Sequence, residues 1–580
     1  MGLFVLHGRG VVLALVGIAL SLCWRGGEAA MAWDSLPLYC AKDMSFTAIP
    51  SLADSVSSSF DGSVSIENVE LVQVHALIRH GSRAPWEALN CWEGYNERWD
   101  CNVTEVTSPS LSIDDGGVAA SGLFRKRYDA FPSNNELRGT CMTGQLLDEG
   151  YRQAEDNGVH LRDAYVCDGS TCLFSDDSAA HLQEAGALYL RSDDEQRTVM
   201  SGQILTASML NVSGVVLDWH TGDDEADYLV PNEARCPRLK ELSGEAYASP
   251  DWIDWLDSWE TKALVEAVDT MWNGTGERDV EDCLMTSACT RRELPADMTP
   301  SLFDEIIAFE TKRIVQESLY NDAAFGKLAM ATLTMEIRER VVGAVNGTSP
   351  LKFVLIAGHD TTFIPFMSAV APNAWDMVWP PYSSLLTIEL LRVDGQEADA
   401  AAGDDAVGGG YFFRLVYNGQ VLRLEGCDDD VCGIEAFLNA TQFSVDMQGE
   451  EHCCCTNMTQ AEVDASNREN GGETVAVSPA PLPVAVSPDS ATAFPTHTAQ
   501  GNDSTGGTLE ANNRSDLLDD EAAASGGSSD GAGVSGLSVA FACFAIGALV
   551  GGIPAVMWYR SFRYEAMRGN DGNGHSYEMT

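Results

Sequence analysis

Basic residues are scarce in this sequence. The 580 residues include 35 Lys plus Arg against 86 Asp plus Glu, so the formal net charge at pH 7 is −51. A chain this acidic repels nucleic-acid phosphates and anionic lipids alike. The composition therefore argues against nucleic-acid binding, and any cluster of cations in the chain needs a specific explanation.

Long apolar runs are few, and the first of them is short. It covers residues 11–23, follows His7 and Arg9, and precedes a small-residue cleavage pattern at 30–32. Because a bilayer span needs about 20 apolar residues, an uncleaved anchor is the weaker alternative. We expect residues 1–32 to be a signal peptide that is removed.

The second apolar run, 536–559, contains no charged residue. At about 1.5 Å per residue, a helix of this length exceeds the roughly 30 Å of a hydrocarbon core. Arg560, Arg563 and Arg568 follow it, and basic residues beside a span tend to stay cytoplasmic. We expect a type I membrane protein with a tail at 560–580, because a GPI signal would end in its apolar segment.

Cysteine is not lacking. Of the 16 cysteines, all but Cys23 and Cys543 lie outside the two apolar runs, and an even number suits disulfides in an oxidising compartment. Four close pairs could form small loops: Cys91/Cys101, Cys167/Cys172, Cys283/Cys289 and Cys427/Cys432. Sequons for N-glycosylation agree with secretion; they begin at Asn102, Asn211, Asn273, Asn346, Asn439, Asn457, Asn502 and Asn513.

Composition changes near residue 457. Residues 457–535 are rich in Ser, Thr, Pro, Gly, Ala and Asp, and such a segment cannot bury enough surface to offset its ordering entropy. We expect a glycosylated stalk there and a folded ectodomain over 33–456. Just before the stalk, the cluster 452–455 (His-Cys-Cys-Cys) superficially suggests a metal site, but adjacent cysteines fit a tetrahedral site poorly. We assign them to disulfides and expect no metal or cofactor.

Two apolar segments in the ectodomain read as buried strands, and each ends in polar residues. Residues 69–78 are followed by Arg79, and 353–357 are followed by Gly358, His359 and Asp360. The second strand comes after a helical apolar spacing over 301–345, and helix, loop and strand in that order indicate an α/β layer. Ligands in such sheets bind beyond the carboxyl ends of the strands, so both polar clusters are expected at one site.

The first cluster reads VHALIRHGSRAPW over 74–86 and places His80 between Arg79 and Arg83. A lone histidine at a strand end is ordinarily structural. Here, two arginines held on a turn at Gly81 and stopped by Pro85 would be a costly group of like charges unless an anion binds there. Guanidinium groups match phosphate oxygens in bidentate fashion, so phosphate is the first candidate.

Five motifs resemble the histidine acid phosphatases, the second branch of the histidine phosphatase superfamily. The segment 79–85 matches the family signature R-H-G-x-R-x-P, and the other four follow in the family's order over roughly 69–425. One departure is Asp148, where Thr or a similar residue is usual. The other motifs are GQLLDEGYRQAEDNGVHLRDAY (144–165), LYLRSDDEQRTVMSGQILTASML (188–210), KFVLIAGHDTTF (352–363) and PPYSSLLTIEL (380–390).

The resemblance implies a two-step phosphomonoesterase. His80 would attack phosphorus and form a phosphohistidine, and Asp360 would protonate the leaving alcohol and then help to activate water. The non-bridging oxygens would be held by Arg79, Arg83, Arg191 and His359. The resemblance also implies the expected fold, a three-layer α/β/α sandwich with a mixed central sheet and an inserted, mainly helical cap from about 86–180 and 214–300.

Elementary chemistry supports these roles. Phosphoryl transfer needs fixed cations around one nucleophile, and a carboxyl near a phosphate dianion tends to hold its proton, as an acid working below neutral pH requires. By contrast, we expect Arg197 to form a structural ion pair, His75 to be a packed core residue and Glu389 to be a buried structural carboxylate.

The expected function is a membrane-tethered acid phosphatase acting on small phosphomonoesters, with its active site outside the cytoplasm. An inositol polyphosphate phosphatase is the second alternative, since the acidic cap offers few cations for crowded phosphates. A mutase of the other branch and a surface binding protein with a decayed site are weaker alternatives. The tail sequence YEAM (564–567) resembles an endocytic signal; surface and endolysosomal residence, and a possible homodimer, are left open.

Overall fold

The computed structural model describes residues 37–447, except 41–43, 87–90, 93–94, 102–105, 108–110, 115–116, 121–123, 126–136, 224–226, 272–279, 296 and 396–409. The expected signal peptide, stalk, membrane span, cytoplasmic tail and the 452–455 cluster lie outside these residues. Within the part of the chain that is described, no helix has the length and apolar character needed to cross a membrane.

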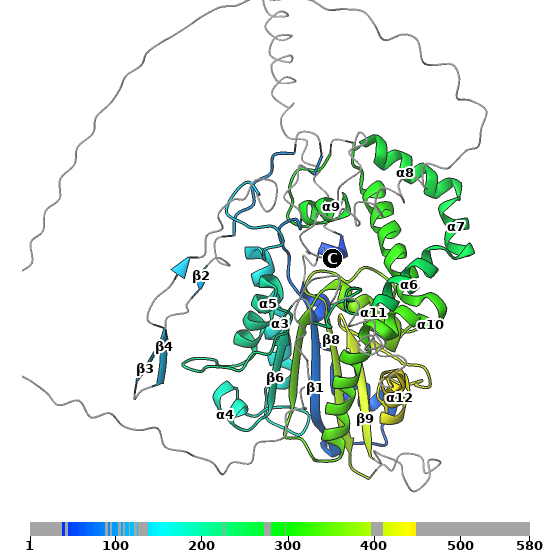
Figure 1. The fold of residues 1–580 in the computed structure, drawn as a ribbon. Coiled ribbons are helices and arrows are strands. Elements are labelled where there is room, and N and C mark those ends of the chain that lie inside the picture. Colours follow the sequence, from blue (N-terminus) through cyan, green and yellow to red (C-terminus); the bar gives the residue numbers. More distant parts are fainter. Residues whose placement is uncertain are drawn as a thin grey trace, which may run out of the picture. The chain divides into compact units, whose positions relative to one another are not determined.

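A mixed sheet forms the centre of the molecule (Figure 1). Its strand order is β10, β9, β8, β1, β7, β6, with β11 paired to β9. Strand β7 is parallel to both β1 and β6, whereas β8 is antiparallel to β1 and to β9. The strands are β1 (Val69–Arg79), β6 (Leu188–Ser192), β7 (Phe353–Gly358), β8 (Leu385–Val393), β9 (Tyr411–Tyr417), β10 (Gln420–Leu422) and β11 (Cys432–Gly433).

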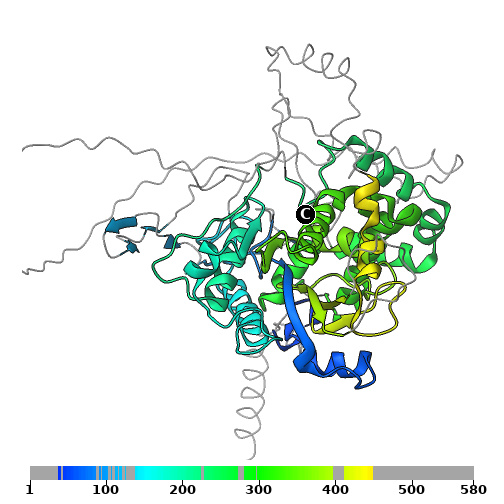
Figure 2. The same cartoon turned by 90° about the horizontal axis from the view of Figure 1, so that it is seen from below.

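Helices cover both faces of this sheet (Figures 1 and 2). Alternate residues of a strand face opposite sides. In β7, Val354 and Ile356 pack with α10 and α11, whereas Phe353 and Leu355 pack with α3 and α5. Both faces are therefore apolar, as a strand buried on two sides requires. These helices are α3 (Asp148–Tyr165), α5 (Gln196–Met209), α10 (Pro300–Val345) and α11 (Asp360–Val370). The expected three-layer α/β/α fold is confirmed.

The long helix α10 follows the predicted helical segment 301–345. It begins where Thr299 Oγ1 accepts a hydrogen bond from Leu302 N (3.1 Å) and Pro300 occupies the first turn, where a missing N–H costs nothing. Tyr320–Ala323 has non-helical backbone angles. The predicted helix is therefore two helical segments joined by a kink.

The cap contains helices beyond one end of the sheet, where α7, α8 and α9 lie above the strands in Figure 1. Its elements are α6 (Pro237–Tyr247), α7 (Pro250–Leu256), α8 (Trp259–Met271), α9 (Val280–Cys289) and the paired strands β2 (Val106–Thr107) with β5 (Phe124–Arg125) and β3 (Leu111–Asp114) with β4 (Gly117–Ala120). The expected cap segment 86–180 includes α3, whose Leu161 and Tyr165 are buried in the core of the sheet.

Short helices complete the described chain: η1 (Leu38–Cys40), η2 (Met44–Thr47), α2 (Leu52–Ser59), η3 (Ile66–Asn68), α4 (Ala179–Glu184), α12 (Ile434–Ala440) and α13 (Gln442–Asp446).

Disulfides connect cysteines that are mostly distant in sequence. Two of the four expected local pairs are confirmed, and two are wrong. Cys283 and Cys289 lie on one helix six residues apart, about 9 Å along its axis, which exceeds the Cα separation that a disulfide allows. The bonds between described cysteines are Cys40–Cys289, Cys91–Cys283, Cys101–Cys141, Cys167–Cys172 and Cys427–Cys432.

Two predictions about buried polar residues are confirmed. His75 is fully buried in β1, and its Nε2 lies 2.8 Å from Gln73 Oε1. Glu389 is also fully buried, where it pairs with Arg414 (Nη2 to Oε1, 2.9 Å) and accepts a hydrogen bond from the Tyr165 hydroxyl (2.7 Å). Both side chains therefore belong to the core.

Candidate active site

Adjacent parallel strands bring the two polar clusters together. Arg79 at the end of β1 is in register with Gly358 at the end of β7, and His80 N donates to Gly358 O (3.0 Å). The rings of His80 and His359 lie 5.3 Å apart. The two segments, nearly 280 residues apart in sequence, thus form one site at the carboxyl edge of the sheet, where α/β proteins place ligands.

The imidazole of His80 has a defined tautomer. Its Nδ1 lies 2.8 Å from the carbonyl oxygen of Gly81. A carbonyl can only accept, so Nδ1 carries the hydrogen and Nε2 keeps its lone pair. Burial lowers the pKa of His80 well below its usual value, and the charge of Arg197, followed by other nearby cations, lowers it further. His80 is therefore neutral and has an unprotonated Nε2 available for bond formation.

The turn after His80 is held closely against the start of α3. A Cβ built on Gly81 would lie 2.4 Å from Gly150 O, and one on Gly150 would lie 2.3 Å from Ser82 O. Only glycine fits at either position, because real Cβ atoms do not approach backbone so closely. Ser82 N also donates to Gln153 Oε1 on α3 (2.8 Å). The fold of the motif thus depends on a helix that follows it by about 65 residues.

Arg79 is buried and has partners on several segments. Its Nη1 donates to Pro380 O (2.6 Å), its Nη2 lies 2.6 Å from Asp360 Oδ2, and its guanidinium stacks 4.3 Å from the Tyr382 ring. Tyr39, from the N-terminal segment, accepts a longer hydrogen bond from Nη2 (3.4 Å). These contacts together fix the position of the guanidinium.

Asp360 is the first residue of α11, and its carboxyl is paired with Arg79. Burial alone would raise its pKa, but the charge of Arg79, with smaller contributions from Arg83 and His359, lowers the pKa below the usual value. Trp379 Nε1 donates to its Oδ2 (2.9 Å). The neighbouring arginine charges therefore favour the carboxylate form of Asp360, and the expected protonation of this carboxyl depends on a phosphate dianion nearby.

Arg83 is held by the cap. Its Nη1 donates to Asp282 Oδ1 on α9 (2.7 Å) and to Ala84 O (3.2 Å). The other carboxylate oxygen of Asp282 accepts from Trp86 N (2.7 Å). No sequence pattern indicated Asp282, which lies 199 residues after Arg83.

Arg197 is a site residue that sequence reasoning missed. It pairs with Glu195, as expected for a structural ion pair, but its Nη2 also lies 3.4 Å from His359 Nδ1, and its charge is the strongest charge that acts on His80. Its guanidinium stacks 4.6 Å from the Trp86 ring. One sequence feature could have indicated Arg197: it is the second arginine of the R-S-x-x-x-R-T stretch. It lies in the first turn of α5, which directs its side chain toward His359.

His359 is oriented from both sides. Its Nε2 pairs with Asp193, which also accepts from the hydroxyl of Thr198, and its Nδ1 faces Arg197. The His359 amide donates to Thr362 Oγ1 (3.0 Å), which stabilises the first turn of α11. Asp193 is a further buried carboxylate that the sequence did not indicate.

Arg191 does not join this group. Its guanidinium pairs with Asp227 (3.1 Å) and stacks 4.3 Å from Tyr228. Arg191 is absent from the main charges that lower the pKa of His80, whereas Arg197 heads them. Arg191 therefore faces the Tyr228 side, because successive strand residues face opposite sides, and Arg197, rather than Arg191, lies beside His359.

The three arginines at the site each have a buried N–H group that lacks a hydrogen-bond acceptor. Arg79, Arg83 and Arg197 are all buried, and the Nε–H of each has no hydrogen-bond partner among the described residues, which is also true of Arg191 and Arg292. Buried N–H groups ordinarily have acceptors, and a tetrahedral oxyanion offers several at once. The described residues contain no cluster of His, Cys, Asp and Glu suited to a metal ion.

Comparison with known proteins identifies relatives. A family model described as histidine phosphatase superfamily (branch 2) matches residues 70–418. Counting factor 60 of Dictyostelium discoideum is 28% identical over 395 residues, which cover 66% of this chain and 88% of that protein. Human lysophosphatidic acid phosphatase type 6 is 25% identical over 412 residues, which cover 68% of this chain and 88% of that protein.

Solved structures give weaker similarity. The phytase of Hafnia alvei in complex with myo-inositol hexakis sulphate has a TM-score of 0.41 and 13% identity, and the match covers 66% of this chain and 98% of the phytase.

Proposed function

Since the chain belongs to branch 2 of the histidine phosphatase superfamily and is a phosphoric monoester hydrolase, we propose that it is an acid phosphatase that acts through a phosphohistidine on His80. One observation carries this proposal. A neutral imidazole with an unprotonated Nε2 lies among three buried arginines that have unpartnered Nε–H groups. Arg79, Arg83 and Arg197 would hold the phosphoryl oxygens, together with His359.

In the first step, His80 Nε2 forms a bond to phosphorus as the bond from phosphorus to the ester oxygen breaks. Asp360 donates its proton to that oxygen, and the alcohol leaves. In the second step, water attacks phosphorus, Asp360 accepts its proton, and the bond from nitrogen to phosphorus breaks to release inorganic phosphate. The arginines stabilise the charge on the phosphoryl oxygens in both transition states.

Asp360 must gain a proton before it can act as an acid. The charge of Arg79 keeps the pKa of Asp360 low. A substrate dianion competes for Arg79 and places negative charge beside the carboxylate, and both effects raise a carboxyl pKa. Substrate binding would therefore be coupled to protonation of Asp360, which favours catalysis in acid.

We rank inositol polyphosphates second as substrates. Crowded phosphates need additional cations around a site, but the charged group that the cap brings to Arg83 is the carboxylate of Asp282. Turnover of phytate at a rate comparable with simple aryl phosphates would reverse this ranking.

We also propose that the enzyme is tethered to a membrane with its active site outside the cytoplasm. The uncharged run 536–559, followed by arginines, supports this topology, and disulfides such as Cys40–Cys289 support an oxidising compartment. Resistance of the full chain to alkaline extraction from membranes, lost when the chain ends at residue 535, would test the tether. If the full chain and the chain that ends at residue 535 were extracted equally well, the membrane tether would be excluded.

The activity itself is tested with purified, detergent-solubilised full chain and p-nitrophenyl phosphate between pH 4 and 7. We expect hydrolysis, and acid quenching with radiolabelled substrate should leave an acid-labile, alkali-stable label on the protein. His80→Ala should lose both, whereas His181→Ala, at an exposed histidine, should keep both. A wild-type protein that is inert would instead support a binding protein with a decayed site.

A further inference from the structure

Asp282 connects the cap to the phosphate arginines. It lies near the start of α9, and its side chain is 9% exposed. One carboxylate oxygen accepts from Arg83 Nη1 and the other from Trp86 N, each at 2.7 Å. The carboxylate therefore bridges the side chain of Arg83 and the backbone three residues later.

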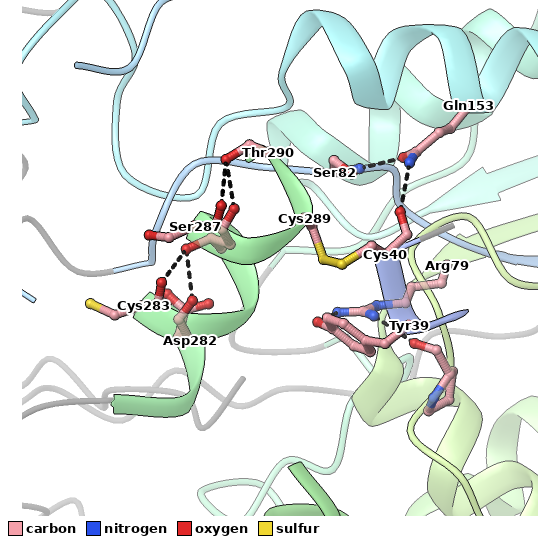
Figure 3. The surroundings of a disulfide bond; sticks show 12 residues. Tyr39, Cys40, Arg79, Ser82, Gln153, Asp282, Cys283, Ser287, Cys289 and Thr290 are labelled. Atoms are coloured by element: carbon pink, nitrogen blue, oxygen red, sulfur yellow. Dashed lines mark hydrogen bonds between the residues drawn. A yellow bond between two sulfur atoms is a disulfide. The ribbon is translucent and has the colours of Figure 1, made fainter. Parts of the chain in front are cut away.

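Helix α9 is itself fixed by disulfides at both ends. Cys283, the residue after Asp282, is bonded to Cys91, and Cys289 is bonded to Cys40. Figure 3 shows Asp282 and Cys283 at one end of the helix and the Cys40–Cys289 bond at the other. Tyr39, the residue before Cys40, points toward Arg79 in the same view, and its hydroxyl accepts from Arg79 Nη2.

We propose that Asp282 is a positioning residue that transmits the fixed position of α9 to the guanidinium of Arg83. This inference rests on the proposed phosphatase function and adds a cap residue to it. An arginine side chain has many rotamers, and productive phosphoryl transfer needs its fork in one orientation. The ion pair with Asp282 selects that orientation, and the two disulfides keep Asp282 in place.

A competing interpretation is that Asp282 occupies Arg83 in place of substrate and must leave when phosphate binds. The contacts argue against it. Asp282 uses only Nη1 of Arg83, and its second oxygen is bound to Trp86 N. The Nε–H of Arg83 stays buried and without a partner, so the guanidinium retains a donor for an oxyanion while the ion pair persists.

The chain offers a matched control in Asp227. Like Asp282, it is a buried carboxylate that pairs with a buried arginine, Arg191, and accepts a hydrogen bond from a nearby backbone amide, that of Leu229 (2.8 Å). Arg191 is not among the main charges that lower the pKa of His80. Removing either carboxylate leaves one buried arginine without its ion pair, but only one of these arginines belongs to the proposed phosphate site.

The test is a double-mutant cycle of Asp282→Ala with Arg83→Ala in the full chain, scored by kcat/KM for p-nitrophenyl phosphate and by the inhibition constant of inorganic phosphate. We expect Asp282→Ala to lower kcat/KM by about 10- to 100-fold and to weaken phosphate inhibition by about tenfold. In the Arg83→Ala background the same change should alter kcat/KM by less than about threefold. Asp227→Ala should leave phosphate inhibition unchanged even if it lowers the melting temperature.

Equal losses in both backgrounds would overturn the inference, because Asp282 would then act without Arg83. Tighter phosphate inhibition in Asp282→Ala would also overturn it and favour the competing interpretation. If Asp282→Ala does not fold, Asp282→Asn enters the same cycle with the same expected outcomes. An inert wild-type protein would contradict the proposed function, whereas an active one with an additive cycle would contradict only the role of Asp282.

Discussion

Arg79 Nη2 lies 2.6 Å from Asp360 Oδ2, and this buried ion pair joins the end of β1 to the first residue of α11. The proposed phosphate ligand and the proposed general acid are therefore paired with each other. A phosphoryl group that takes Arg79 must weaken the interaction that keeps Asp360 ionised. Anion binding and the protonation of Asp360 are thus linked.

This linkage predicts proton uptake when a dianion binds. Titration with tungstate near pH 7, in two buffers with different heats of ionisation, should show uptake of about one proton per bound anion, because added negative charge raises the carboxyl pKa. Asp360→Asn should take up far fewer protons, whereas Asp376→Asn, at an exposed surface carboxylate, should behave as wild type. Identical uptake by wild type and Asp360→Asn would show that another group takes the proton.

The proposed role of Arg197 in place of Arg191 gives a second prediction. Arg197→Ala should lower kcat/KM by about 10²–10³, the usual cost of losing one donor to a charged transition state. Arg191→Ala, in which the ion pair with Asp227 is lost instead, should lower it much less. Steady-state kinetics of both variants on one aryl phosphate decide the matter, and a larger loss for Arg191→Ala would restore the sequence-based assignment.

The lowered pKa of His75 predicts that the folded protein loses stability in acid. Burial lowers the pKa of His75 from its ordinary 6.5 to about 3, with a smaller effect from the charge of Arg340. Between those values the unfolded chain binds a proton that the folded chain does not. The contribution of His75 to stability is therefore complete above pH 6.5 and decreases as the pH falls toward 3, by about 1.4 kcal/mol per pH unit.

Denaturant unfolding of His75→Gln at pH 7 and pH 5 measures this effect. The variant should lose about 2 kcal/mol less than wild type between these pH values, whatever its stability at pH 7. His181 is a suitable control, because it is exposed and its hydrogen bond to Asp176 raises its pKa, so His181→Gln should not reduce the acid loss. Equal acid losses in His75→Gln and wild type would contradict the prediction.

Breaking the buried ion pair of Glu389 and Arg414 should lower the stability of the fold without changing the catalytic rate. Glu389→Ala leaves the guanidinium of Arg414 buried without its carboxylate, which should lower the free energy of unfolding by about 3–5 kcal/mol. The kcat of the remaining folded protein should be close to wild type, since Glu389 is packed among β8, β9 and α3 rather than at the site. Asp100→Ala removes an exposed ion pair with Arg98 and should change neither quantity. A large fall in kcat for Glu389→Ala would place this carboxylate in the mechanism.

The sequence identified the residues whose local context is distinctive. An apolar strand that ends in Arg79 and His80, and a second that ends in His359 and Asp360, were enough to predict an α/β sheet with one site at its carboxyl edge. This succeeds because strand hydrophobicity and a strand end are local properties. The two local disulfide loops and the long helix α10 were predictable for the same reason.

Other features depend on which side of an element a residue faces. Arg191 and Arg197 both belong to the R-S-x-x-x-R-T stretch, and the sequence alone favoured Arg191 as the phosphate ligand. A strand directs Arg191 to Asp227, whereas the first turn of α5 directs Arg197 to His359. Motif spacing does not specify this difference, because it depends on where the strand ends and the helix begins.

By itself, the sequence singled out the proposed nucleophile, the proposed acid and two of the proposed phosphate arginines, because these residues lie within short segments that fold in one way. Only the tertiary structure decided the partners of those residues. The partners Asp282, Tyr39 and Asp193 come from distant segments, and two of these segments are held in place by disulfides whose pairing no local pattern encodes. The charge on each group at the site, and so its chemistry, is set by these long-range neighbours.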